Sequence, residues 1–206
     1  RRIVPSFPEV TKVLLTGSSA GGFGAAFNYD RVAQAFCPKP VVLIDDAGPP
    51  MADAYLAPCL QQRWRDLWGM NANMPADCAD CVQPDGGGIV NYGDYIGAKY
   101  PATRLGLISA DRDNVISLFF GYGSNDCAQI DGIALPMSGD MFSEGLLDLR
   151  DNHMKMTENW GTFFVSATTH TYLGGDGYYN TTVAGTALTD WVNAMVNDGQ
   201  PGHVGP

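Results

Sequence analysis

Positive charge is scarce in this sequence. The 206 residues include 12 Lys and Arg against 22 Asp and Glu, which gives a net charge of −10. Proteins that bind nucleic acids displace counterions from phosphates with clustered Lys and Arg, and the sequence has no basic stripe of that kind. The same shortage argues against docking on an anionic membrane surface. We therefore predict that neither a nucleic acid nor a membrane is a partner.

Long apolar runs are also missing. No apolar stretch approaches the ~20 residues that span a bilayer, and no segment resembles a signal peptide.

Cys78-Ala-Asp-Cys81 has the spacing of half a zinc site, but no second Cys/His pair of similar spacing accompanies it. The sequence therefore predicts no metal.

Cysteine is present in an odd number, and its placement indicates disulfides. Several of the five cysteines lie in Pro- and Asp-rich loops, where disulfides staple loops of exported proteins. We expect a secreted protein in which one thiol is free or paired outside this chain. The cysteines are Cys37, Cys59, Cys78, Cys81 and Cys127.

Apolar runs alternate with segments of helical pattern along the chain. Short apolar runs bounded by turn residues are typical of buried parallel strands, and they occur at residues 12–16, 41–45, 104–109 and 162–167. Helices are expected at residues 22–36, 114–122, 143–157 and 183–197. This alternation predicts one α/β domain over residues 1–206, with a mostly parallel sheet and helices on both faces. Residues 49–100 are expected to form an insertion, either a lid or binding loop or a disulfide-stapled excursion that covers a sheet edge.

The segment Gly17-Ser18-Ser19-Ala20-Gly21 follows the first predicted strand and precedes a predicted helix. This G-x-S-x-G pattern in this context is typical of a sharp turn that exposes a nucleophilic serine. Ser19 is the predicted nucleophile, and Ser18 is the alternative that lacks the symmetric glycines. The positions of Gly17 and Gly21 are expected to require a very small residue, because strand and helix crowd there. The N–H of Ala20, at the start of the helix, is the predicted donor to an oxyanion.

A serine nucleophile needs a base, and the sequence has three histidines. His203 lies in a C-terminal segment that looks like a loose tail, and His153 lies in a predicted helix at a solvated position. His170 follows the fourth predicted strand and precedes the last helix, which is where the base of an α/β-hydrolase lies. We predict His170 as the base.

The acid is expected after the third predicted strand, where Asp111 and Asp113 both stand. Asp113 precedes an apolar pair at a helix start, which favours it. Alternatively, Asp111 is the acid and Asp113 is the N-terminal cap of the helix. Either choice gives the chain order Ser–Asp–His of α/β-hydrolases.

Three short stretches resemble the family of pectin acetylesterases and Notum-like carboxylesterases. They are "TGSSAGG", "DDAGPPMAD" at residues 45–53 and "TTHT" at residues 168–171, and the spacing agrees from Val13 to Trp191. The resemblance implies an α/β-hydrolase-like fold and a cofactor-free mechanism with Ser19 and His170. It also places Asp46 and Gly48 near the substrate.

The sequence departs from the family at two places. Ser18 replaces a family cysteine, and Pro49-Pro50 replaces an aromatic pair. The family's first strands and second oxyanion donor precede the turn that carries the nucleophile, which is residues 17–21 here and is called the elbow below. We therefore expect an N-terminal segment of the same precursor as a partner.

The resemblance implies cleavage of carboxylic esters outside the cell. The expected substrate is an O-acetyl ester on a polysaccharide such as pectin. The rivals are a lipase, polyester depolymerase or peptidase on the same scaffold, and a catalytically silent binding protein.

Overall fold

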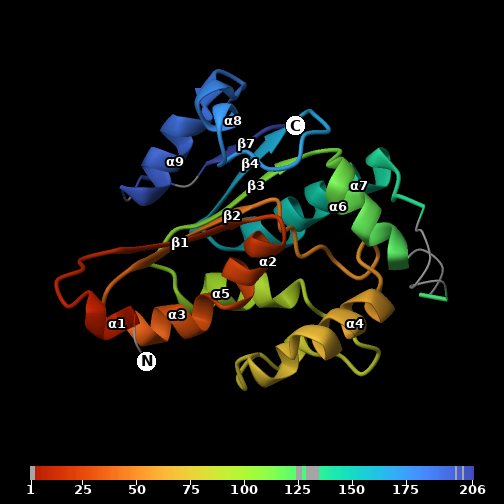
Figure 1. Ribbon diagram of the computed structural model, residues 1–206, viewed down its shortest axis with the longest axis horizontal. Helices are drawn as coiled ribbons and strands as arrows, with labels where there is room; N and C mark the ends of the chain where they lie inside the picture. Colours follow the sequence, from red (N-terminus) through yellow and green to blue (C-terminus); the bar gives the residue numbers. More distant parts are fainter. Residues whose placement is uncertain (1–2, 124–126, 129–134, 198, 201) are drawn as a thin grey trace.

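The fold is built on a parallel sheet. The computed structural model describes residues 3–123, 127–128, 135–197, 199–200 and 202–206 (Figure 1). Within them, five parallel strands form one sheet in the order β1-β2-β3-β4-β7. The strands are β1 (Val13–Ser18), β2 (Val41–Asp46), β3 (Leu105–Ala110), β4 (Trp160–Val165) and β7 (His203–Val204).

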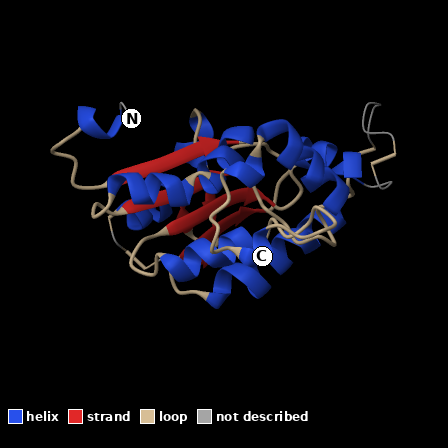
Figure 2. Ribbon diagram, turned by 90° about the horizontal axis from the view of Figure 1, so that it is seen from below, coloured by secondary structure: helices blue, strands red, loops and turns tan. Residues whose placement is uncertain are grey.

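Helices cover both faces of the sheet, so the predicted α/β class is confirmed. Helices α2, α3 and α5 lie on one face and α9 lies on the other (Figures 1 and 2). The helices are α1 (Ile3–Ser6), α2 (Ala20–Phe27), α3 (Tyr29–Phe36), α4 (Pro58–Trp68), α5 (Asn91–Lys99), α6 (Asn114–Phe120), α7 (Gly139–Asp148), α8 (Asp176–Asn180) and α9 (Leu188–Val196).

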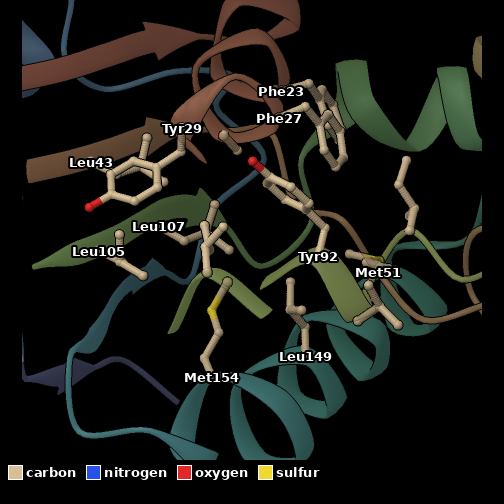
Figure 3. Packing of buried hydrophobic residues seen from close by; sticks show 14 of the residues in the cluster. Phe23, Phe27, Tyr29, Leu43, Met51, Tyr92, Leu105, Leu107, Leu149 and Met154 are labelled. Atoms are coloured by element: carbon tan, nitrogen blue, oxygen red, sulfur yellow. The ribbon is translucent and has the colours of Figure 1, made fainter. Parts of the chain in front are cut away.

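The central strands send alternate side chains into two separate cores. Leu43 and Leu105 enter the larger core, which also holds Tyr92 and Met154 (Figure 3). Ile44 and Ile108, whose side chains face the opposite side of the sheet, enter the smaller core under α9. Burial on both faces explains why these strands are continuous apolar runs in the sequence.

The predicted helices at 22–36 and 183–197 are not continuous α-helices over those ranges. The helix predicted at 22–36 breaks at Asn28, whose side-chain amide donates to the carbonyl of Gly24 at 2.8 Å and so competes with the backbone ladder. The segment 183–187 forms a small hairpin instead, β5 (Thr182–Val183) and β6 (Thr186–Ala187), before α9 begins.

The C-terminal segment is not the loose tail that the sequence predicts. Residues 203–204 form β7, which pairs with β4, and Nδ1 of His203 lies 3.1 Å from Oγ1 of Thr162. A two-residue strand between Gly202 and Gly205 leaves no periodic signal, so its place in the sheet could not be predicted from the sequence.

The segment 49–100 contains two helices that the sequence analysis did not predict, α4 and α5. The side chain of the buried Arg65 holds its loops by three hydrogen bonds to main-chain carbonyls. The acceptors are Gly86 at 2.9 Å, Cys81 at 2.6 Å and Gly87 at 2.8 Å. Tyr92 and Ile96 of α5 belong to the larger core. Much of this segment is therefore part of the packed domain.

Candidate functional site

Ser19 lies on a sharp turn between the end of β1 and the start of α2. Its φ and ψ are 60° and −126°, a left-handed conformation that is rare outside glycine. Its N–H donates to the carbonyl of Asp46 on β2 at 2.8 Å. A Cβ at Gly17 would lie 2.1 Å from the carbonyl oxygen of Gly21, so only glycine fits at that position of the turn.

The second predicted crowding point lies one residue further along the chain. A Cβ at Gly21 would meet nothing within 4 Å, whereas a Cβ at Gly22 would lie 2.2 Å from Oδ1 of Asp45. The expectation for Gly21 is therefore wrong, because the face of α2 that packs on β2 carries Gly22 and leaves Gly21 exposed.

His170 and Asp113 form a hydrogen-bonded pair. Nδ1 of His170 lies 2.7 Å from Oδ2 of Asp113, whose side chain is fully buried. The other carboxylate oxygen, Oδ1, accepts from the N–H groups of Val115 and Ile116 at 2.8 and 2.9 Å at the start of α6. Asp113 is thus both the helix cap and the partner of His170, two roles that the sequence presented as alternatives.

Asp111 contacts different groups. Its carboxylate accepts from Oγ of Ser166 at 3.1 Å and the N–H of Ala167 at 3.2 Å, and it pairs with Arg112. These contacts join the ends of β3 and β4 and do not involve His170.

Asp46 and Gly48, which the resemblance placed near the substrate, both lie in the interior. The side chain of Asp46 accepts from Oγ of Ser18 at 2.7 Å and from the N–H of Leu173 at 2.9 Å. A Cβ at Gly48 would lie 2.4 Å from the backbone nitrogen of Phe23. Their contacts are with the elbow, α2 and the loop after His170.

The other two histidines lie in different surroundings. Nδ1 of His153 is 2.8 Å from Oδ2 of Asp94, and this hydrogen bond raises the pKa of His153. His153 is therefore not the solvated side chain that the sequence predicts. Burial lowers the pKa of His203 in β7.

An open apolar cavity begins directly beside the elbow. Its volume is about 280 Å³, and Ala20, the residue after Ser19, is part of its wall. Ala20 begins α2, so its N–H belongs to the helix-start donors that have no acceptor within the helix. The other lining residues are Phe23, Gly24, Phe27, Asn28, Trp68, Met70, Asn73 and Met74.

The cysteines form two disulfides, as the sequence predicts. Cys59 pairs with Cys127 and Cys78 pairs with Cys81, while Cys37 is an exposed free thiol. In the described part of the chain, no group of three His, Cys, Asp or Glu side chains could hold a metal ion. No helix among the described residues is both long and apolar enough to cross a membrane.

Comparison with solved structures identifies the fold. The structure of the Wnt deacylase Notum from Drosophila superposes with a TM-score of 0.63 at 17% identity, over 98% of this chain and 59% of the Notum chain. The chain has the α/β-hydrolase fold of Notum.

A second crystal form of Notum gives a TM-score of 0.59 at 18% identity, over 96% of this chain and 59% of that chain. The fold and the resemblance predicted from the sequence are confirmed at the level of structure. This chain spans 59% of the length of the Notum chains it matches. No protein-family model and no curated protein sequence matches it.

Proposed function

We propose that this protein is a serine hydrolase of carboxylic esters. The observation that carries the proposal is the pair of His170 and the buried Asp113, 2.7 Å apart, on loops that follow the neighbouring strands β3 and β4. In the same sheet, the strained Ser19 directly follows β1. Backbone strain of this kind is found at functional sites, where the surrounding structure holds it.

In the proposed mechanism, Oγ of Ser19 attacks the ester carbonyl while Nε2 of His170 takes the serine proton. Asp113 holds the imidazole in the tautomer with Nδ1 protonated and stabilises the imidazolium that forms. The N–H of Ala20 donates to the oxyanion. His170 then protonates the departing alcohol, and a water molecule, deprotonated by His170, releases the acid and regenerates Ser19.

The substrate we propose is an O-acetyl ester on a polysaccharide such as pectin, met outside the cell. The elbow and the two other stretches that resemble the pectin acetylesterases support it. Two disulfides support an extracellular location, because disulfides persist in oxidising compartments.

A longer acyl group is the second candidate, and the apolar cavity beside Ala20 favours it. An acyl group held at Ser19 could extend along Phe23 and Phe27 into this cavity. The fold neighbour Notum is itself named a deacylase.

A panel of p-nitrophenyl esters of increasing acyl length, together with acetylated pectin, tests both candidates. The acetyl hypothesis predicts the highest kcat/KM for acetate and release of acetate from pectin. Gly24→Leu provides a matched probe, because Gly24 lines the cavity and a Cβ there meets nothing within 4 Å. It should spare acetate hydrolysis and impair only longer esters.

No hydrolysis of any ester by the wild-type protein, with Ser19→Ala behaving identically, would favour a silent binding protein. In that case the elbow would be structure only.

We also propose that an N-terminal segment of the same precursor supplies a strand along the outer edge of β1. Among the described strands only β2 pairs with β1, and Leu14 is 47% exposed there. An open apolar edge promotes aggregation. Residues 1–206 should therefore be less soluble when expressed alone than with the upstream segment, and equal solubility and activity would contradict this proposal.

A further inference from the structure

The carboxylate of Asp46 joins two segments that are far apart in the sequence. On one side, Oγ of Ser18 donates to Oδ2 at 2.7 Å. On the other side, the N–H of Tyr172 donates to Oδ1 at 2.9 Å and Oδ2 at 3.0 Å, and the N–H of Leu173 donates to Oδ2 at 2.9 Å. Asp46 therefore connects the strand end that carries the elbow to the loop that follows the candidate base.

We infer that Asp46 is a positioning residue that fixes Ser19 relative to His170. Ser18 directly precedes Ser19, and Tyr172 is two residues after His170, so the carboxylate is bonded to the chain next to each reacting side chain. This inference rests on the proposed function.

The backbone on both sides of this bridge is strained. Ser19 has a φ of 60° and Thr171 a φ of 66°, and a β-branched residue such as Thr is rarely left-handed. Such conformations persist only where the surroundings hold them. The N–H of Ser19 bonds to the main-chain carbonyl of Asp46 at 2.8 Å, and the N–H that follows Thr171 bonds to its carboxylate. One residue thus holds both strained positions.

The bridge depends on the carboxylate and not only on a side chain of this size. The side chain of Asp46 is fully buried, where an unmade hydrogen bond is costly. Oδ2 accepts from three donors, and Oδ1 accepts from the N–H of Tyr172. Asparagine has the same shape but one acceptor oxygen, so its amide group would face N–H groups on one side of the bridge.

The expected consequence is a fall in kcat of about 10²-fold in Asp46→Asn, the scale of a displacement of about 1 Å between reacting groups. KM should stay unchanged, because a buried side chain does not touch the substrate. Ser18 is exposed, and Ser18→Ala removes only its own hydrogen bond to Asp46, on the elbow side of the bridge. This variant should lower kcat by a smaller factor, again without a change in KM.

Asp53→Asn is the matched control. Asp53 also accepts from a side chain and a main-chain N–H, Nε2 of Gln61 at 2.8 Å and the N–H of Gly88 at 3.0 Å, but both lie in the segment 49–100. Both donors bond to the same oxygen, Oδ1, which the amide oxygen of asparagine can replace, so Asp53→Asn should not lower kcat. Equal kcat losses in Asp46→Asn and Asp53→Asn would overturn the inference.

Two further results keep the test decisive. If Asp46→Asn does not fold, an unchanged kcat in Ser18→Ala overturns the inference. If the wild-type protein hydrolyses no ester, the proposed function fails, and amide hydrogen exchange still tests the bridge. Exchange at Tyr172 and Leu173 should then be faster in Asp46→Asn than in the wild type, and unchanged exchange would contradict the role of Asp46.

Discussion

Two histidine–aspartate pairs in this molecule have almost the same geometry and very different surroundings. The separations are 2.7 Å for His170 and Asp113 and 2.8 Å for His153 and Asp94. The Asp113 side chain is 0% exposed and also holds two main-chain N–H groups of α6, whereas the Asp94 side chain is 38% exposed.

The positions of the two pairs in the fold differ even more. His170 follows β4, on a loop that Asp46 bonds to the strand carrying the elbow. His153 ends a short π-helix and contacts α5. The hydrogen bond to Asp94 raises the pKa of His153, so this imidazole keeps its proton to higher pH than an unpaired histidine. The comparison teaches that a His–Asp pair becomes a candidate base through its connection to a nucleophile.

Replacing each histidine by alanine tests this difference most strongly. His170→Ala should lower kcat by roughly 10⁶-fold, because the base and the nucleophile act as one unit. His153→Ala should leave ester hydrolysis close to the wild-type rate. Steady-state kinetics on p-nitrophenyl acetate measures both, and an active His170→Ala variant would remove the proposed triad.

The aspartates should differ by a smaller factor. Asp113→Asn should lower kcat by about 10⁴-fold by favouring the wrong imidazole tautomer, while Asn still caps α6 and the melting temperature changes little. Asp94→Asn should keep its activity. If Asp111→Asn is inactive and Asp113→Asn is active, the acid has been assigned to the wrong residue.

The elbow is the element that the second pair lacks, and its packing gives a prediction about stability. Gly22→Ala should destabilise the protein by about 1–3 kcal/mol, because the new methyl group meets Asp45 and the backbone of β2. Gly21→Ala, with open space around its Cβ, should instead stabilise α2 by up to about 1 kcal/mol. Urea unfolding of both variants measures the difference, and equal effects would mean that α2 and β2 are not in close contact.

The smallest expected effect concerns pH. The raised pKa of His153 means that its pair with Asp94 stabilises the fold below the ordinary histidine pKa of about 6.5 and that this stabilisation is lost as the pH rises through the raised pKa. Asp94→Asn should therefore lower the melting temperature slightly at acidic pH and not at alkaline pH. The effect is small because the pair is partly exposed. A loss that grows with pH would contradict the assignment.

The sequence predicted those parts that local pattern determines. The strands β1 to β4 are apolar runs, and Ser19 and His170 follow two of them, so the fold class and the candidate residues could be proposed from order alone. The sequence could not show which of Asp111 and Asp113 contacts His170, because one carboxylate can cap a helix and bond to a histidine at the same time.

The remaining features depend on contacts between distant residues. Asp46 and Tyr172 are 126 positions apart, and no sequence pattern links them. The strand β7 is too short for periodicity, and the need for glycine at position 22 of α2 comes from Asp45 on β2. Tertiary packing decides such features, and a single sequence does not reveal it.

Covalent labelling with a fluorophosphonate probe, followed by peptide mass spectrometry, tests the central claim most directly. A serine activated by a neighbouring base reacts with such a probe, whereas an ordinary surface serine does not. We predict one adduct on Ser19, retained in His153→Ala and lost in His170→Ala. An adduct on Ser18, an adduct that survives in His170→Ala, or no adduct on the folded wild-type protein would contradict the account.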